Sequence, residues 1–216
     1  MLLTSIGIVA LVLLTYGTLR HGRLVRALRQ VSEPAELAGT AVRLGELGDA
    51  AFVAGIRHPA IYCDQRLVEP LTPRKLDAVL LHEQAHQHAS DPARLALLGL
   101  LAPVVRRLPS GRQWLVSTIA RREIEADRYA LDHGASRADL AAALLVIPSM
   151  SRPQVAGFPT AVDLRLQVLL GDREAVPTPR VVGCSGRMLV GLVVGAAVCT
   201  WVLHGPVTRA LVLLCC

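Results

Sequence analysis

Residues 72–86 read TPRKLDAVLLHEQAH and combine a helix start with two histidines four residues apart. Threonine is a good N-cap and proline is favoured at the first helical position, so we expect a helix to begin at Thr72-Pro73. Apolar residues then recur at roughly helical spacing. Because residues four apart lie on one face of a helix, His82 and His86 can direct ring nitrogens at a common point.

The two histidines belong to a His-Glu-x-x-His motif, a pattern typical of zinc hydrolases. His82 and His86 would bind one Zn²⁺. Glu83 would stand beside the metal, where it can take a proton from the zinc-bound water and pass it to the leaving amine. The alternative is a solvated polar helix face that happens to hold two histidines. The apolar residues 78–81 argue against it, because in a buried helix unpaired His and Glu side chains are costly.

A catalytic zinc needs a third protein ligand, and carboxylates gather downstream in residues 121–128, RREIEADR. Glu123 and Asp127 are again four residues apart. We expect Glu123 to be the third ligand, and Asp127 to accept a hydrogen bond from a ligand imidazole and so fix its tautomer. Glu125 is expected to face solvent or an arginine. The alternative for this segment is an ordinary salt-bridged helix with alternating charges.

Residues 80–86, LLHEQAH, and residues 122–127, REIEAD, resemble the motifs of the integral-membrane gluzincins. This group includes the HtpX-type and prenyl-protein-type membrane proteases and the beta-lactam-sensor metallopeptidases. The resemblance covers about residues 60–170 and implies that His82, His86 and Glu123 hold zinc, with Glu83 as the base. It does not extend to a receptor function, because the Ser-x-x-Lys motif of a penicillin-binding domain is missing. The chain is also short, with two expected spans where members of the group often have four or more.

Two other side chains are weaker candidates for contact with the reacting groups. Arg165 or His133 could stabilise the oxyanion of a tetrahedral intermediate. For each, the alternative is a structural or surface residue. His88 lies six residues after His82, on a different helical face, and is not expected to be a ligand.

The composition favours lipid contact. Hydrophobic residues make up 52% of the 216 residues, and the mean hydropathy is +0.45. We expect transmembrane helices over residues 1–19 and 188–204, because both runs are apolar and long enough for a hydrocarbon core of ~30 Å. The alternative for the first is a buried helix. Arginines follow it at positions 20, 23, 26 and 29, which by the positive-inside rule places the next domain in the cytoplasm. The predicted location is therefore the cell membrane, with two spans.

Between the expected spans lie a basic juxtamembrane and linker segment (20–50), a zinc metallopeptidase domain (51–176) and a linker (177–187), and a short tail (205–216) follows. Residues 50–67 are expected to form a small β-hairpin or pair of edge strands. Further helices are expected at residues 93–105, buried or dipping into the membrane, from Ser110-Gly111 to about His133-Gly134, from Ser136 to before Pro148, and over residues 161–170. The expected fold class is mainly α: a membrane-anchored, zincin-type helical metallopeptidase domain with a small β element.

These features predict a membrane-anchored zinc-dependent endopeptidase with one Zn²⁺ per chain, a protein or peptide substrate and contact with membrane lipid. One alternative is a non-catalytic membrane scaffold or regulator that retains the zinc-binding fold. Another is a membrane-surface or nucleic-acid-binding regulator that uses its arginines, since the net charge is +6. Nucleic acid is not expected as a partner, because no basic run is interleaved with aromatic residues and no recognition motif is present.

Overall fold

The computed structural model describes residues 2–48, 50–107, 110–146 and 161–171. By its internal packing the chain divides into two units. One unit consists of residues 21–179 and contains the sheet and the helices that carry the predicted site. The other consists of residues 1–20 and 180–216, of which residues 2–20 are described; they form the first part of helix α1 (Leu2–Gln30).

The larger unit contains a four-stranded mixed sheet with the strand order β1-β2-β4-β3. The outer pairs are antiparallel, whereas the two central strands run parallel. The strands are β1 (Ser32–Leu37), β2 (Thr40–Gly45), β3 (Ala51–Ala54) and β4 (Ala60–Asp64). The β3–β4 hairpin confirms the strand pair predicted within residues 50–67.

The first half of the sheet lies in residues 20–50, which we predicted to be a juxtamembrane linker. Pro34 stands in β1, which is an edge strand. Proline is tolerated there because its missing N–H can face the side of the strand that has no neighbour. Ala38 and Gly39 have φ values of 47° and 76°, the two positive values that a two-residue type I′ hairpin turn requires. The prediction of a mainly α fold with a small β element is therefore wrong. In the described part of the chain, seven helices accompany a four-stranded mixed sheet.

The helices of the predicted site begin where their sequence signals place them. Thr72 caps α3 (Pro73–His88) by accepting a hydrogen bond from the Lys75 amide. α5 (Gly111–Asp132) starts at the predicted glycine, and the Ser136 hydroxyl accepts a hydrogen bond from the Asp139 amide at the start of α6 (Arg137–Val146). The unit also contains α2 (Gln65–Val68), α4 (Asp91–Val105) and α7 (Ala161–Leu169).

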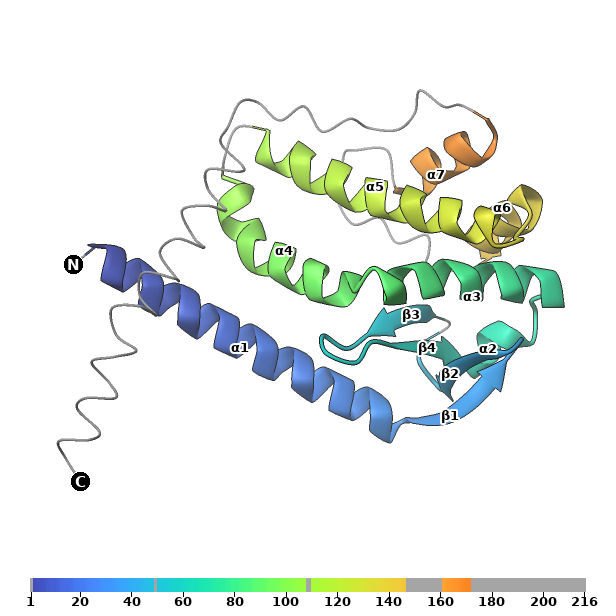
Figure 1. The fold of residues 1–216 in the computed structure, drawn as a ribbon, viewed down its shortest axis with the longest axis horizontal. Helices are drawn as coiled ribbons and strands as arrows, with labels where there is room; N and C mark the ends of the chain where they lie inside the picture. The colour runs from blue at the N-terminus through green and yellow to red at the C-terminus, as the bar shows by residue number, and fades with distance from the viewer. Residues whose placement is uncertain (1, 49, 108–109, 147–160, 172–216) are drawn as a thin grey trace. The chain divides into compact units, whose positions relative to one another are not determined.

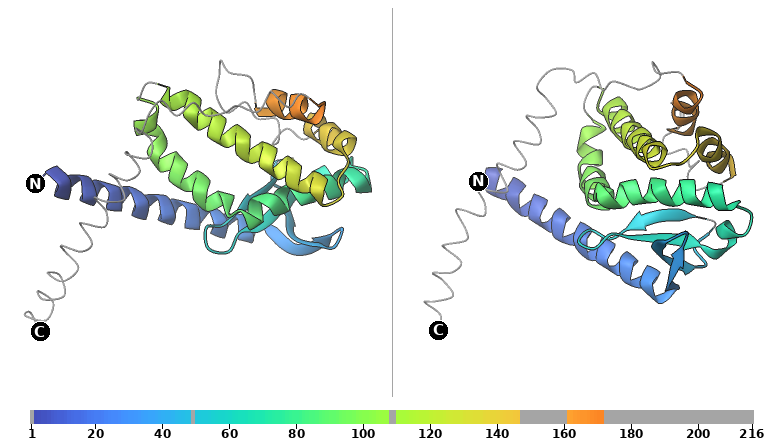
Figure 2. Two further views of the ribbon diagram at one scale, coloured as in Figure 1. Left: turned by 45° about the horizontal axis from the view of Figure 1, so that its top comes forward. Right: turned by 45° about the vertical axis from the view of Figure 1, so that its right-hand side comes forward.

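Helix α3 lies between the sheet and helices α5, α6 and α7, as the three views in Figures 1 and 2 agree. One face packs on the sheet in a cluster that includes Ile61, Cys63, Val79 and Leu80. The opposite face packs on α5, α6 and α7 in a cluster of Ala78, Ala130, Leu140, Leu144 and Leu169. A helix covered on both faces is buried, so the polar side chains that it carries must find partners inside the protein.

Helices α4 and α5 pack on each other through Ala102, Val105 and Leu115. Gly111 begins α5 at a point where a Cβ atom would collide with the carbonyl oxygen of Val105, so this close approach requires glycine. Residues 93–105, which we expected to be buried or to dip into the membrane, are therefore part of a helix whose second half packs on α5, whereas Leu95 and Leu97 in its first half are exposed.

The predicted membrane anchoring is not borne out. No helix in the described residues is both long enough and apolar enough to cross a bilayer. α1 does not end with the apolar run predicted as the first span, but continues through Arg20, Arg23, Arg26 and Arg29 to Gln30 as one helix. The predicted second span, residues 188–204, lies outside the described residues. We therefore correct the prediction of a two-span protein of the cell membrane with a cytoplasmic catalytic domain.

Candidate metal centre

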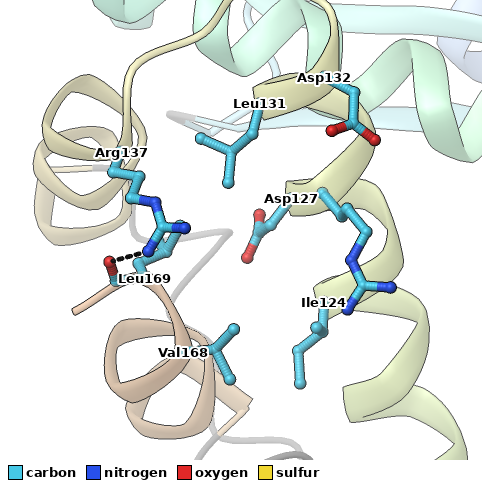
Figure 3. Close-up of a pocket in the computed structure, with 8 residues that line it drawn as sticks. Ile124, Asp127, Leu131, Asp132, Arg137, Val168 and Leu169 are labelled. Carbon is cyan, nitrogen blue, oxygen red and sulfur yellow. Dashed lines mark hydrogen bonds between the residues drawn. The ribbon is translucent and has the colours of Figure 1, made fainter. Parts of the chain in front are cut away.

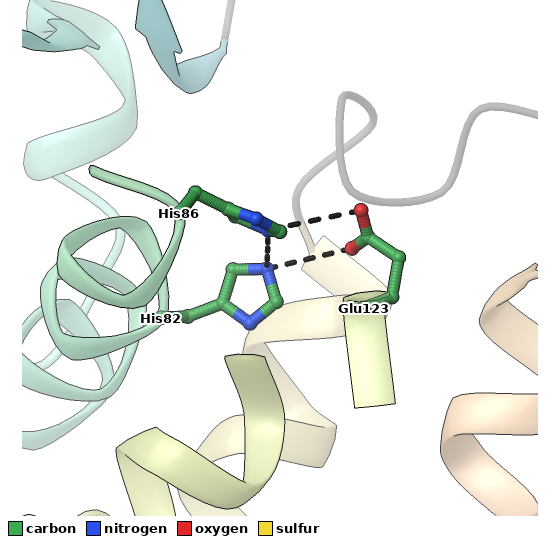
Figure 4. A group of neighbouring side chains, drawn as sticks. All are labelled: His82, His86 and Glu123. Atoms are coloured by element: carbon green, nitrogen blue, oxygen red, sulfur yellow. Dashed lines mark hydrogen bonds and ion pairs between the residues drawn. The ribbon is translucent and has the colours of Figure 1, made fainter. Parts of the chain in front are cut away.

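Three side chains from α3 and α5 converge on one point (Figure 4). The Nε2 atoms of His82 and His86 lie 3.1 Å apart. Glu123 Oε2 lies 3.5 Å from His82 Nε2, and Glu123 Oε1 lies 3.7 Å from His86 Nε2. Ligand atoms at ~2.0–2.1 Å from a tetrahedral Zn²⁺ are separated from one another by roughly 3.3 Å. The observed separations are close to that value, so the three residues fit one zinc ion.

The outer nitrogen of each imidazole faces a carboxylate. His82 Nδ1 lies 2.9 Å from Asp127 Oδ1, and His86 Nδ1 lies 2.8 Å from Asp91 Oδ2. A proton on each Nδ1 satisfies these contacts and leaves both Nε2 atoms as acceptors. Two acceptor nitrogens and a carboxylate then point at the same place, which is an arrangement that a cation stabilises.

Arg165, on α7, joins the carboxylates behind His82. Its Nε and Nη2 atoms donate to the two oxygens of Asp127 at 2.7 and 2.6 Å, and Nη1 donates to Glu123 at 3.0 Å. The side chain is 1% exposed and is not among the residues that line the cavity beside the metal ligands. The structure thus places Arg165 behind the ligands and does not bring it to the position we expected for an oxyanion contact.

The pKa values of His82 and Glu123 without a metal also indicate that positive charge is favoured at this site. Burial and the nearby Arg165 act to lower the pKa of His82, but the hydrogen bonds to Asp127 and Glu123 outweigh them and raise it to about 9. For Glu123, burial acts to raise the pKa, but the hydrogen bond to His82 and the charge of Arg165 lower it to about 2. Without a metal, the neighbouring carboxylates therefore keep His82 protonated. A bound cation would supply the positive charge in place of that proton.

Glu83 lies one residue beyond His82 and is 4% exposed. Burial raises its pKa above the ordinary glutamate value, although the charges of His82 and His86 act in the opposite direction. A carboxylate with a raised pKa is a stronger base, which suits proton transfer near neutral pH.

An open cavity of about 160 Å³ adjoins the ligands and gives Glu83 access to a small molecule or peptide group. Its wall includes three residues of β3, which lies at one edge of the sheet. The cavity is lined by Ala51, Phe52, Val53, His82, Glu83, His86, Asp91, Pro92, Leu95 and Glu123. The three converging side chains therefore adjoin an open cavity.

Like Arg165, His133 is a candidate that does not line this cavity. Its ring stacks on Tyr129 with centroids 3.8 Å apart, and its Nδ1 atom lies 2.8 Å from the Tyr129 carbonyl oxygen at the exposed end of α5. Glu125 also stays outside the ligand group and pairs with Arg122 at 3.0 Å, as expected for an exposed carboxylate.

A second cavity, of about 460 Å³, lies between α5, α6 and α7 (Figure 3). It is lined by Asp127, which contacts His82, but by none of the three converging side chains His82, His86 and Glu123. On one side of it, Arg137 donates to the Leu169 carbonyl oxygen at 3.5 Å. Its lining residues are Ile124, Asp127, Arg128, Leu131, Asp132, Arg137, Val168 and Leu169.

Sequence reasoning missed Asp91 and the actual contacts of Arg165. Asp91 follows the motif helix by three residues and could have been suspected as a carboxylate close to His86 in sequence. Comparisons with protein-family models, curated proteins and solved structures find no match for this chain. The resemblance to the gluzincins therefore stays a prediction that rests on residues 80–86 and 122–127.

Proposed function

We propose that this protein is a zinc-dependent endopeptidase. The observation that carries the proposal is the convergence of His82, His86 and Glu123 on one point, with Glu83 beside them at an open cavity. The ligand atoms of the three residues all lie within 4.8 Å of one another. Two histidines and a glutamate with one open position are a donor set that catalytic zinc uses.

The bond that breaks in the proposed reaction is the C–N bond of a peptide. Zinc, when bound, would lower the pKa of a coordinated water to about 7 and polarise the carbonyl group. Glu83 accepts the proton that the attacking water loses and later donates it to the leaving nitrogen. Asp127 and Asp91 each hold one imidazole through its Nδ1 atom, so the ligand nitrogens keep their direction while the proton moves.

A peptide is the substrate class that the walls of the cavity favour. Ala51, Phe52 and Val53 belong to the edge strand β3 and line the same cavity as Glu83. An extended peptide can add to such an edge through main-chain hydrogen bonds, while alternate side chains enter pockets. This arrangement would hold a scissile peptide bond beside the ligand group.

The test is an assay in which zinc-loaded protein is incubated with casein or a mixed peptide library and hydrolysis is measured. Wild type is compared with Glu83→Gln, with wild type in the presence of a chelator, and with the control variant Glu125→Gln. Glu83→Gln should lower the rate by about 10²–10⁴-fold with its zinc content unchanged, because only proton transfer is lost. Chelation should abolish activity, and the exposed control should behave as wild type. Full activity in Glu83→Gln would overturn the mechanism. A wild type that binds zinc but cleaves nothing would favour a non-catalytic scaffold.

A further inference from the structure

The chain turns sharply between α3 and α4, directly after the motif helix. α3 ends at His88, and Ser90 has a φ of 54°, in the left-handed region that non-glycine residues rarely adopt. The turn starts α4 at Asp91 and brings this carboxylate back over the side chain of His86, five residues earlier. A continuous helix would place residues five apart on different faces, so the contact depends on the turn.

Asp91 uses its two oxygens differently. Oδ2 lies 2.8 Å from His86 Nδ1, whereas Oδ1 lies 3.5 Å from Arg94 Nη1 and 4.0 Å from Arg122 Nε. The Asp91 side chain is 6% exposed, but the two arginines are 51% and 36% exposed. Exposed arginines at these distances neutralise a carboxylate only weakly, so the imidazole of His86 is the partner in closest contact with the buried charge.

We propose that Asp91 is a positioning residue for the metal centre. It accepts the Nδ1 hydrogen of His86, keeps the Nε2 lone pair directed at the ligand point, and makes that nitrogen a stronger donor to a cation. Because Asp91 is also the first residue of α4, it connects the orientation of His86 to the position of this helix. The inference rests on the proposed function for its zinc, but its test measures metal affinity and does not require turnover.

A purely structural role does not account for this placement. A carboxylate at the start of α4 would stabilise that helix equally well in a solvated position, as helix N-termini favour negative charge at low cost. Asp91 is instead buried at the wall of the cavity that holds Glu83 and the zinc ligands. Burial of a carboxylate is unfavourable unless its partner needs the charge, and His86 is that partner.

The test is the zinc affinity of wild type, Asp91→Ala and Asp91→Asn, measured by competition with a chromophoric chelator at one fixed pH. Asp91→Ala should weaken zinc binding by about 10–100-fold, the range for loss of an outer partner of a ligand histidine. Asp91→Asn should fall between, because the amide oxygen still accepts the Nδ1 hydrogen but the charge is gone. Glu125→Ala is the matched control, since it removes an exposed carboxylate that also pairs with Arg122.

Urea unfolding in excess chelator shows whether each variant is folded before metal is added. If Asp91→Ala does not fold, Asp91→Asn carries the comparison. A folded Asp91 variant with zinc affinity within twofold of wild type would overturn the inference and leave the proposed function standing. Weakened affinity in a protein whose wild type cleaves no peptide would support the inference while the peptidase proposal fails. A wild type that binds no zinc would overturn both.

Discussion

The two sides of the candidate metal centre are built differently. Behind His82, Asp127 is 4% exposed and Arg165 is 1% exposed, and the two form a bidentate pair at 2.6 and 2.7 Å. Behind His86, Asp91 is almost as buried, but its arginine partners are half-exposed and lie at 3.5 and 4.0 Å. The first side joins α3, α5 and α7, whereas the second lies at the turn between two consecutive helices.

This difference suggests that one side contributes mainly to the stability of the fold and the other mainly to metal binding. The His82 side is part of the protein core, where an unpaired charge is costly and each partner depends on the others. The His86 side is at the wall of the cavity, where solvent and exposed arginines moderate the loss of any one contact. We therefore expect substitutions of the residues behind His82 to lower the free energy of unfolding, and substitutions of the residues behind His86 to lower mainly the affinity for metal.

The largest effect is expected for Arg165→Met. The variant removes the cation and leaves the buried Asp127 and the partly buried Glu123 without their arginine partner, so the free energy of unfolding should fall by about 3–5 kcal/mol. Urea denaturation in excess chelator measures it. Arg94→Ala is the matched control on the other side, and its exposed ion pair should contribute ~1 kcal/mol or less. Equal losses in the two variants would contradict the contrast between the two sides.

The next effect is a pH dependence of the metal-free protein. The pKa of His82 is 6.5 in the unfolded chain and about 9 in the folded protein, so the folded state holds one extra proton between these values. The stabilisation is complete below pH 6.5 and is lost as the pH rises through 9, at about 1.4 kcal/mol per pH unit. With saturating zinc this slope should vanish, because the metal replaces the proton.

Denaturant midpoints between pH 6.5 and 9, with zinc and with chelator, check the slope. His82→Gln removes the titrating group and should make the metal-free protein insensitive to pH in this window. A metal-free wild type whose stability is constant or rises from pH 6.5 to 9 would contradict the account of the His82 side.

The sequence predicted those parts of the site that depend on local rules. Thr72 and Ser136 are caps that act on amides three residues later, and the ligand pairs lie four apart on their helices, so neither needs tertiary information. These rules were sufficient to select His82, His86 and Glu123, the three residues whose ligand atoms the structure brings together. The pairing of α3 with α5 was inferred only from the chemistry that a third ligand requires.

The missed features depend on contacts that local rules do not contain. Arg165 meets Asp127 across 38 residues, and Asp91 reaches His86 only because Ser90 adopts a left-handed conformation. Strands β1 and β2 were missed because Pro34 and Gly39 are also typical of linkers; here they fit an edge strand and a tight hairpin turn. Hydropathy likewise predicted a span for an apolar run that forms one part of the longer helix α1.

The zinc content of purified protein tests the central claim most directly. After zinc loading and removal of free metal, we predict about one zinc per chain in wild type and in Glu125→Ala. Tightly bound zinc should be lost in Glu123→Ala, because the third ligand is gone. A wild type without zinc, or a Glu123→Ala variant that keeps it as firmly as wild type, would contradict the assignment of His82, His86 and Glu123 as a zinc site.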